Sequence, residues 1–300
     1  MNLTNSEVRI ENTSICNAKC IICPRDKFIR PKLTMPNRHF NELVAQAKAL
    51  GAETISVFGY GEPLCDQNVV EKVQAVSDAG LESFITTNAS LLDSDLSSRL
   101  VGAGLSHVRF SAHGLWDNYE SVHRGLKFDR FMRNVFNFIA ISRGGVKISV
   151  SVIPMFGESV GEIREFWEER VDFLEIWKPH NWTTGRNYRG ETVKRKKTCG
   201  RPTSGPIQVQ SDGKMVVCCF DYNGVLEVGD TYNDSIEDII KGAKYNSIRE
   251  KHRKGDLSGL ICSTCDQLNV GNTNPLLYSS RDPECNINVT SSTKFKLKEK

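Results

Sequence analysis

The sequence predicts an α/β protein in which parallel β-strands alternate with α-helices. Two observations support this prediction: six segments with strand character are separated by five segments with helical periodicity, and a glycine directly follows several of the helical segments. This order is typical of βα units joined by right-handed crossovers. The periodicity does not choose between a barrel and a doubly wound sheet, and both remain open at this point.

The expected strands are short and rich in β-branched or aromatic residues. They span Val8–Ile10, Thr54–Phe58, Glu82–Thr87, His107–Ser111, Lys147–Ile153 and Phe173–Trp177. The expected helices are amphipathic, and they span Asn37–Leu50, Val69–Ala79, Asp95–Val101, Arg130–Ser142 and Val160–Arg170. In the first helix, Asn37 can cap the start, and Gly51 follows the end. Its apolar stripe comprises Phe40, Leu43, Val44 and Ala47.

A smaller α+β region is expected after residue 185. Gly205–Gln210 and Lys214–Cys218 are predicted to form a β-hairpin, because the Asp212-Gly213 pair between them suits a tight turn. Two helices are predicted next, at Asp234–Gly242 and Ala243–His252. We therefore divide the chain into residues 1–185, residues 186–285 and a polar, Lys-rich tail with little order at 286–300.

The composition is that of an ordinary globular protein, with 39% hydrophobic and 25% charged residues. A formal net charge of +3 is too small to indicate nucleic-acid or membrane binding. The N-terminus is polar and lacks a signal-peptide pattern, and no run approaches the ~18 apolar residues of a membrane span. We expect a cytoplasmic protein, in which ten cysteines indicate metal binding rather than disulfides.

The loop after the first strand carries three closely spaced cysteines, Cys16, Cys20 and Cys23. Cysteine thiolates are the usual ligands of iron–sulfur clusters, and a [4Fe–4S] cube normally takes four of them. Three ligands would therefore leave one iron open to bind another molecule. Zinc is the alternative, but a structural zinc site usually adds a second cysteine pair nearby, and none follows this loop.

This loop resembles the cluster loop of the radical S-adenosylmethionine (SAM) enzymes. The resemblance implies a partial (β/α)6 barrel, with the site at the carboxyl ends of its strands. It also implies that the open iron binds SAM and that reductive cleavage gives a 5′-deoxyadenosyl radical, which removes a hydrogen atom from the substrate. An electron donor such as flavodoxin or ferredoxin would supply the electron. The sequence departs from the family at Ile22, where an aromatic residue is common.

A glycine-containing turn, Gly59-Tyr60-Gly61-Glu62-Pro63, follows the second strand. Taken alone, it fits a tight structural turn with a solvated glutamate equally well. In its place one βα unit after the cluster loop, it resembles the family's GGEP motif, which implies that Gly61, Glu62 and Pro63 contact the SAM amino group. Asn88 and Ser111 lie at the ends of the third and fourth strands, where their side chains could bond the ribose and carboxylate of SAM. The segment Ser111–Gly125, which contains His123-Arg124-Gly125, resembles the family's stretch in which a serine and an arginine contact SAM, which implies contacts at Ser111 and Arg124. For the residues at these strand ends, a turn or helix-cap role is the alternative.

His180 lies at the predicted end of the sixth strand, between Pro179 and Asn181. Imidazole titrates near neutrality, so His180 is a candidate for a substrate contact or a proton relay. A loop histidine without a catalytic role is an equal alternative. The sequence identifies no other catalytic residue.

Four cysteines of the C-terminal region form a second set: Cys199, Cys218, Cys262 and Cys265. A hairpin and a C-x2-C turn can bring them together around a second cluster or a zinc ion. This region resembles the twitch module, a shortened SPASM module that follows the barrel in some radical SAM enzymes and holds one auxiliary [4Fe–4S] cluster. Cys219 is expected to point away from the position of Cys218 along the strand. Cys65 and Cys285 are expected to be ordinary thiols.

The layout is similar to that of 2-deoxy-scyllo-inosamine dehydrogenase, which implies oxidation of a small carbohydrate or aminocyclitol-like metabolite. Peptide modification and sugar epimerisation by related enzymes remain alternatives. Two other classes stay open. A non-catalytic metal-binding scaffold would have no use for the Gly61-Glu62-Pro63 turn. A nucleic-acid-modifying enzyme would use Lys194–Lys197 as a phosphate patch, but such a run is more often a solvated linker, so no nucleic-acid partner is expected.

Overall fold

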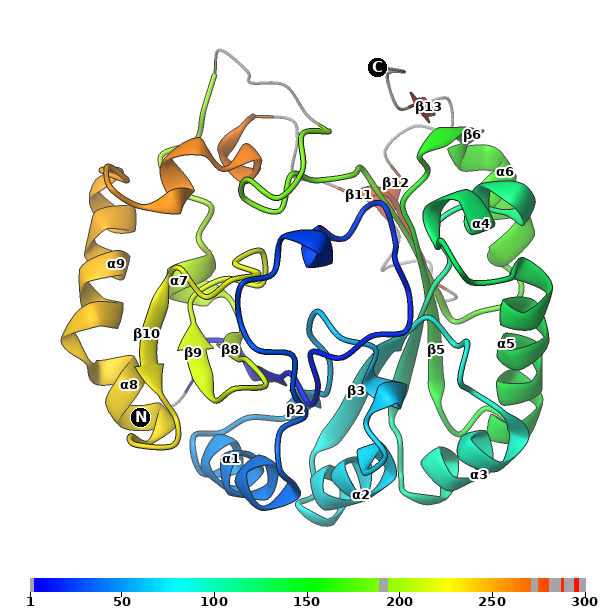
Figure 1. Cartoon of the computed structure of the whole chain (residues 1–300), viewed down its shortest axis with the longest axis horizontal. Helices are drawn as coiled ribbons and strands as arrows, with labels where there is room; N and C mark the ends of the chain where they lie inside the picture. Colours follow the sequence, from blue (N-terminus) through cyan, green and yellow to red (C-terminus); the bar gives the residue numbers. More distant parts are fainter. Residues whose placement is uncertain (1–2, 189–193, 271–274, 281–286, 289–293, 297–300) are drawn as a thin grey trace.

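The structure is a computed structural model, and it describes residues 3–188, 194–270, 275–280, 287–288 and 294–296. These residues form a curved sheet with helices on its outer side (Figure 1). The long loop of residues 11–36, which carries the three N-terminal cysteines, lies at the centre of this arrangement.

Six parallel strands form the central part of the sheet: β1 (Glu7–Ile10), β2 (Thr54–Ser56), β3 (Glu82–Thr87), β4 (His107–Ser111), β5 (Lys147–Val152) and β7 (Phe173–Trp177). Each strand pairs in parallel with the next one in this series. A doubly wound sheet would reverse its strand order part-way. The sequential order therefore confirms the partial (β/α)6 barrel.

The crossovers contain five helices in the predicted places: α1 (Asn37–Ala49), α2 (Val69–Asp78), α3 (Ser94–Gly102), α5 (Phe128–Ser142) and α6 (Val160–Trp167). They cover the outer face of the sheet (Figure 1). In α1 the predicted apolar stripe is buried against the sheet. Pro36 rather than Asn37 occupies the N-cap position, so Asn37 is the first helical residue and not the cap.

The sequence does not predict two elements between β4 and α6. Helix α4 (Trp116–Val122) buries Tyr119 and Val122, which is too few residues for a visible apolar stripe. Strand β6 (Phe156–Ser159) contains Gly157 with φ 88°, a conformation unusual in a strand. Helix α4 is important for the site because its C-terminal end lies beside the cysteine loop, as described below.

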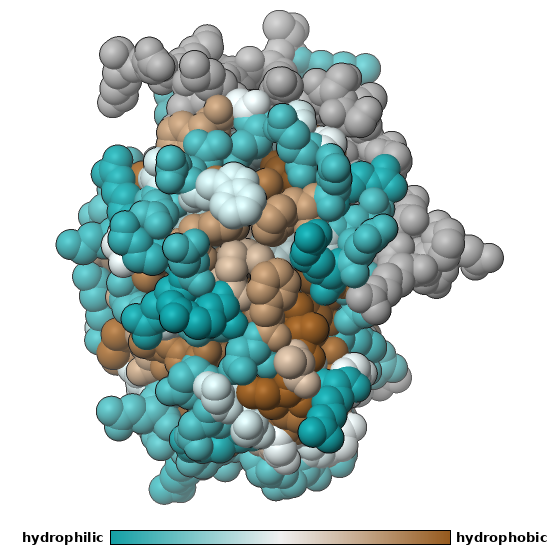
Figure 2. Space-filling model, turned by 90° about the vertical axis from the view of Figure 1, so that its right-hand side faces the viewer, coloured by the Kyte–Doolittle hydropathy of each residue, from teal (hydrophilic) through white to brown (hydrophobic). Residues whose placement is uncertain are grey.

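Helices α4, α5 and α6 lie on the side of the molecule that Figure 2 presents. Apolar side chains gather on this face and are bordered by hydrophilic ones (Figure 2). Trp116, which is 61% exposed, still places its ring centroid 5.1 Å from that of Phe128 and 5.5 Å from that of Phe166. The exposed aromatic surface at Trp116 is therefore continuous with the packed interior.

The C-terminal region extends the sheet beyond β1. Strands β8 (Ile207–Val209) and β9 (Lys214–Val216) form the predicted antiparallel hairpin, with Gly213 at φ 82° in the turn. Strand β8 pairs in parallel with β1, and β9 pairs with β10 (Glu227–Asp230), which the sequence does not predict. The described part of this region also contains three α-helices, α7 (Arg201–Ser204), α8 (Ile236–Lys241) and α9 (Ala243–Lys254), and two short 3-10 helices, η3 (Ile261–Thr264) and η4 (Asp266–Leu268). The barrel and the C-terminal region thus share one continuous sheet.

At the opposite edge of the sheet, β11 (Pro275–Ser280) pairs with β7 and continues to β12 (Ile287–Asn288). Strand β13 (Lys294–Lys296) pairs with β6. The expectation of a tail with little order is therefore wrong for β12 and β13, because strand pairing orders them; the rest of residues 286–300 lies outside the described residues. Within the described part of the chain, no helix combines the length and the apolar character needed to cross a membrane.

Candidate active site

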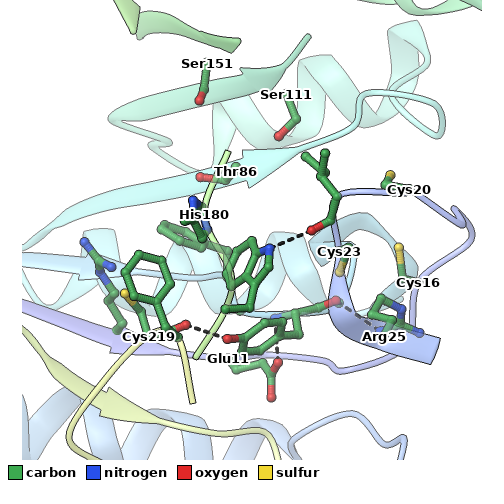
Figure 3. Close-up of a pocket in the computed structure, with 18 of the residues that line it drawn as sticks. Glu11, Cys16, Cys20, Cys23, Arg25, Thr86, Ser111, Ser151, His180 and Cys219 are labelled. Carbon is green, nitrogen blue, oxygen red and sulfur yellow. Dashed lines mark hydrogen bonds between the residues drawn. The ribbon is translucent and has the colours of Figure 1, made fainter. Parts of the chain in front are cut away.

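A cavity of about 440 Å³ lies at the carboxyl ends of the parallel strands. Its lining includes residues at or just after the ends of β2, β3, β4, β5 and β7, together with residues of the cysteine loop and of the C-terminal region. In Figure 3, Cys16, Cys20 and Cys23 lie together at one side of this central cavity, and Cys219 lies at the opposite side. The barrel and the C-terminal region therefore both contribute to one site.

The three cysteines of the cysteine loop are partly buried. Burial raises the pKa of Cys23 to about 12 and also raises the pKa values of Cys16 and Cys20. A cation bound between these thiols would stabilise their thiolate forms and oppose this shift. In the residues that the structure describes, no three His, Cys, Asp or Glu side chains are arranged to hold a single metal ion. Three thiols beside a common cavity fit a cluster of several irons with one open position.

Residues that follow β7 hold the backbone of the cysteine loop. Trp182 Nε1 donates a hydrogen bond of 2.6 Å to the carbonyl oxygen of Ile22 (Figure 3). The carbonyl oxygen of Ile21 accepts hydrogen bonds from Tyr188 Oη at 2.6 Å and from Arg186 Nε at 2.8 Å. Sequence reasoning missed these contacts, because the segment has the composition of a linker and nothing in it points to the loop.

The carboxylate of Glu62 is buried at the edge of the central cavity. Its Oε1 accepts hydrogen bonds from Thr87 Oγ1 at 2.6 Å and from the backbone N–H of Leu64 at 3.2 Å, and its Oε2 accepts one from the backbone N–H of Asn88 at 2.8 Å. Burial raises the pKa of Glu62 to about 7, although these hydrogen bonds oppose that shift. The hydrogen bonds of Glu62 therefore fix the turn after β2 to the end of β3.

The turn that contains Glu62 also contacts both halves of the site. A Cβ atom at Gly61 would lie 2.1 Å from the carbonyl oxygen of Thr13, so glycine is required there. The N–H of Tyr60 donates to Glu11 Oε1 at 2.7 Å, and Tyr60 Oη donates to the carbonyl oxygen of Cys219 at 2.6 Å (Figure 3). Tyr60, which stands in place of the first glycine of the GGEP motif, thus connects the barrel to the C-terminal region.

A second and smaller cavity lies within the C-terminal region. Its lining combines the four predicted ligands with four apolar and four polar or charged residues: Cys199, Cys218, Cys262, Cys265, Pro202, Val217, Leu226, Leu268, Thr183, Arg201, His252 and Gln267. Burial raises the pKa of Cys262 to about 12 and that of Cys265 to about 11. Cys219 lines the central cavity, and Cys218 lines both cavities. A side-chain hydrogen bond between the two thiols raises the pKa of Cys218 and lowers that of Cys219. The two side chains therefore lie close together, and the expectation that Cys219 points away from Cys218 is wrong. Four thiols around one small cavity fit a cluster whose irons are all ligated by the protein.

The basic run at the start of this region packs against the C-x2-C turn. Arg195 Nη2 donates to the carbonyl oxygen of Cys265 at 3.0 Å, and the N–H of Lys196 donates to that of Leu268 at 2.7 Å. This part of the run therefore has a structural role, which the sequence does not predict.

The sequence matches the radical SAM superfamily over residues 10–169, more than half of the chain. The chain belongs to the radical SAM superfamily. Residues 199–266 match the SPASM iron–sulfur cluster-binding domain. SAM and two [4Fe–4S] clusters, one that binds SAM and one auxiliary, are therefore the cofactors of this radical SAM enzyme.

Curated relatives of this radical SAM enzyme include GTP cyclases. A probable GTP 3′,8-cyclase of Methanothermobacter marburgensis is 32% identical over 172 residues, which cover 56% of each chain. An Fe-coproporphyrin III synthase of Methanosarcina barkeri is 27% identical over 141 residues, which cover 46% of this chain and 34% of that protein. The chain thus spans about half the length, or less, of these two curated relatives.

Solved structures share the fold over more of the chain. BtrN, crystallised with AdoMet and 2-DOIA, is 20% identical with a TM-score of 0.65 and covers 88% of this chain and 93% of its own. Streptococcus suis SuiB, crystallised with the precursor peptide SuiA, is 16% identical with a TM-score of 0.68 and covers 82% of this chain and 66% of its own. The similarity to these proteins concerns the fold.

The structure brings most of the predicted SAM contacts of this radical SAM enzyme together. Gly61, Glu62, Asn88 and Ser111 line the central cavity, and Pro63 is buried next to Glu62 but is not among the lining residues. Arg124 is not brought to the site. Arg124 is exposed and does not line the central cavity, although its carbonyl oxygen accepts a hydrogen bond from the N–H of Lys19 at 3.3 Å.

His180 also lines the central cavity. Its ring centroid lies 4.1 Å from that of Trp182 and 4.5 Å from that of Phe220. These aromatic contacts, one from the segment after β7 and one from the C-terminal region, fix the orientation of the imidazole beside the cavity. Cys65 lines neither cavity, and Cys285 lies outside the described residues.

Proposed function

We propose that this radical SAM enzyme oxidises a carbinol carbon of a small carbohydrate or aminocyclitol-like metabolite. The observation that carries the proposal is the wall between the two cavities, because Arg201, Cys218 and Gln267 line both of them. An auxiliary cluster held by the four C-terminal cysteines would therefore lie next to the bound substrate. An electron acceptor in this position suits an oxidation, because an alcohol that loses a hydrogen atom and a proton must also lose one electron.

The proposed ligands of the SAM-binding cluster are Cys16, Cys20 and Cys23, and the proposed ligands of the auxiliary cluster are Cys199, Cys218, Cys262 and Cys265. When bound, SAM and the two clusters supply a radical that removes a hydrogen atom and a site that accepts the remaining electron. The hydroxyl proton must pass to a basic group in the central cavity. His180 is our candidate for this role, because its imidazole lines the central cavity and a neutral imidazole nitrogen can accept a proton.

The polarity and the size of the central cavity support a small polar substrate. Arg9, Arg109 and Glu175 contribute charged groups to its wall. Arg109 Nη1 lies 3.3 Å from Glu175 Oε2, and Arg9 Nε lies 2.6 Å from Oε1 of Glu7, which is outside the lining. Such groups can form hydrogen bonds with hydroxyl and amino groups. A cavity of about 440 Å³ that holds SAM as well favours a small metabolite over a peptide. BtrN, whose structure contains 2-DOIA, shares its fold with 88% of this chain, and this similarity supports the choice of a small metabolite.

Product analysis tests the proposal. Anaerobically reconstituted protein is incubated with SAM, a flavodoxin or ferredoxin reducing system and pools of sugars and aminocyclitols deuterated at their carbinol carbons. We expect a product that lacks two hydrogen atoms, together with deuterium in the 5′-deoxyadenosine. Conversion of GTP to a cyclised product, as the names of the curated relatives suggest, or modification of a peptide without oxidation of any small molecule, would contradict the proposal.

The proposed contact between Glu62 and the SAM ammonium group gives a separate prediction. We expect Glu62→Gln to weaken SAM binding about 10- to 150-fold, which corresponds to roughly 1.5–3 kcal/mol for one hydrogen bond to a charged group. The amide lacks the negative charge, and its NH2 group would face the donors at Thr87 or Asn88. Titration calorimetry with SAM on reconstituted protein measures the effect.

Glu158→Gln is the matched control for this experiment. Glu158 is also buried, and its Oε1 accepts a hydrogen bond of 3.0 Å from the backbone N–H of Leu115, but it does not line the central cavity. Both variants should retain about eight irons per chain. Equal SAM affinity in Glu62→Gln and in the parent protein would show that the turn has a structural role alone.

A further inference from the structure

The side chain of His123 lies against one of the proposed cluster ligands. Its Nδ1 is 3.2 Å from Cys20 Sγ, a hydrogen-bonding distance for sulfur. The ring is 1% exposed and stacks between Tyr119, at a centroid distance of 4.4 Å, and His113, at 5.0 Å with an interplanar angle of 6°. The imidazole therefore has a fixed orientation toward the thiol.

The hydrogen bonds of the other ring nitrogen fix the tautomer of His123. The backbone N–H of His113 donates to His123 Nε2 at 3.2 Å, so this nitrogen acts as an acceptor and carries no hydrogen. The single ring hydrogen of the neutral imidazole is then on Nδ1, which faces Cys20 Sγ. His113 is itself held in place, because its Nδ1 accepts a hydrogen bond from the N–H of Ile153 at 3.1 Å.

The backbone on either side of His123 holds the residues on either side of Cys20. The N–H of Ile21 donates to the carbonyl oxygen of Val122 at 2.9 Å, and the N–H of Lys19 donates to that of Arg124 at 3.3 Å. Three consecutive residues at the C-terminal end of α4, residues 122–124, therefore form hydrogen bonds with residues 19–21 of the cysteine loop. The distance between His123 and Cys20 is set by these flanking contacts and not by the two side chains alone.

We propose that His123 donates an N–H···S hydrogen bond to Cys20 and thereby raises the reduction potential of the SAM-binding cluster. Reduction adds negative charge to the cluster and its thiolates, so a donor at the sulfur stabilises the reduced form more than the oxidised form. His123 is then a positioning residue that makes it easier to deliver the electron needed for SAM cleavage. The inference rests on the proposed assignment of Cys20 as a ligand and not on the identity of the substrate.

Two substitutions separate the hydrogen bond from the packing of the ring. His123→Phe keeps an aromatic ring but has no donor, whereas His123→Asn can place an amide N–H near the position of Nδ1. Both variants lose the nitrogen that accepts a hydrogen bond from the N–H of His113, so a difference between the two variants does not come from that loss. Redox titration monitored by electron paramagnetic resonance gives the midpoint potential of each cluster in the reconstituted variants.

For His123→Phe we expect the ratio of reduced to oxidised SAM-binding cluster to fall about tenfold at a fixed potential, which is about 59 mV for a one-electron couple. His123→Asn should recover part of this shift, and the potential of the auxiliary cluster should stay unchanged in both variants. An unchanged potential in His123→Phe, or equal shifts in the two variants, would overturn the proposal.

If the His123→Phe variant does not bind its cluster, the proposal can still be tested on the protein without substitutions. In protein labelled with [15N]histidine, pulsed electron paramagnetic resonance of the reduced SAM-binding cluster should detect one weakly coupled histidine nitrogen. The absence of this coupling would overturn the proposal. The ligand assignment is tested independently by Cys20→Ala, because retention of about eight irons and of SAM cleavage in that variant would remove Cys20 as a ligand.

Discussion

Replacing Cys16, Cys20 and Cys23 together by alanine is expected to abolish SAM cleavage and to lower the iron content from about eight to about four per chain. The three thiols line the central cavity and, in our assignment, hold the cluster that binds SAM. The four C-terminal cysteines surround a separate cavity, so their cluster should remain. Iron analysis after anaerobic reconstitution and chromatographic detection of 5′-deoxyadenosine measure the two effects.

Cys65→Ala is the control for loss of a cysteine near the same turn. Cys65 follows Glu62 closely but lines neither cavity, so this variant should keep its iron and its SAM cleavage. If the triple variant still forms 5′-deoxyadenosine, the assignment of the cysteine loop is wrong.

The second large effect is expected in Cys262→Ala/Cys265→Ala, which should lose substrate oxidation but retain some uncoupled SAM cleavage. Both thiols line the small cavity and are absent from the lining of the central one, so their removal leaves the proposed SAM contacts in place. If an electron must cross the wall at Cys218, the variant can still form 5′-deoxyadenosine but no oxidised product. Quantification of both products in the same reaction separates the two activities.

Thr264→Ala is a matched control, because Thr264 is an exposed residue of the same C-x2-C turn and lies outside both cavity linings. It should oxidise substrate at the parental rate. Iron analysis of the double variant must confirm that about four irons are missing. Equal yields of oxidised product from the double variant and the parent would rule out the role of electron acceptor and leave a structural role for the C-terminal cluster.

Much of the barrel was predictable, because its elements carry strong local signals. Three strands have the predicted bounds, namely Glu82–Thr87, His107–Ser111 and Phe173–Trp177. In each case an apolar or alternating segment is bordered by residues that favour turns or helix ends. Helix α4 and strand β10 were missed for the opposite reason. Helix α4 buries two side chains, and β10 is a four-residue strand whose pairing with β9 contains a bulge, so their stability comes from tertiary contacts that no local pattern reports.

The site was predictable where chemistry depends on spacing along the chain. The C-x3-C-x2-C loop and the Gly61-Glu62-Pro63 turn could be identified because their residues are close in sequence. The contacts of Trp182 with Ile22 and of His123 with Cys20 join residues more than a hundred positions apart, and nothing in the sequence around either donor points to the cysteine loop. Only the packing of the folded chain shows that these side chains support the cysteine loop.

The pairing of β8 with β1 determines how the chain can be divided. Although β1 is the first strand of the barrel, it is not an edge strand, because β2 pairs with one of its edges and β8 pairs with the other. A protein truncated near residue 185 would leave backbone N–H and C=O groups of β1 without partners along that side. The same strand carries the core residues Val8 and Ile10, so the truncated barrel would present a template for strand exchange and aggregation. Residue 185 therefore marks a change in composition but not a point at which the barrel can be released as an independent unit.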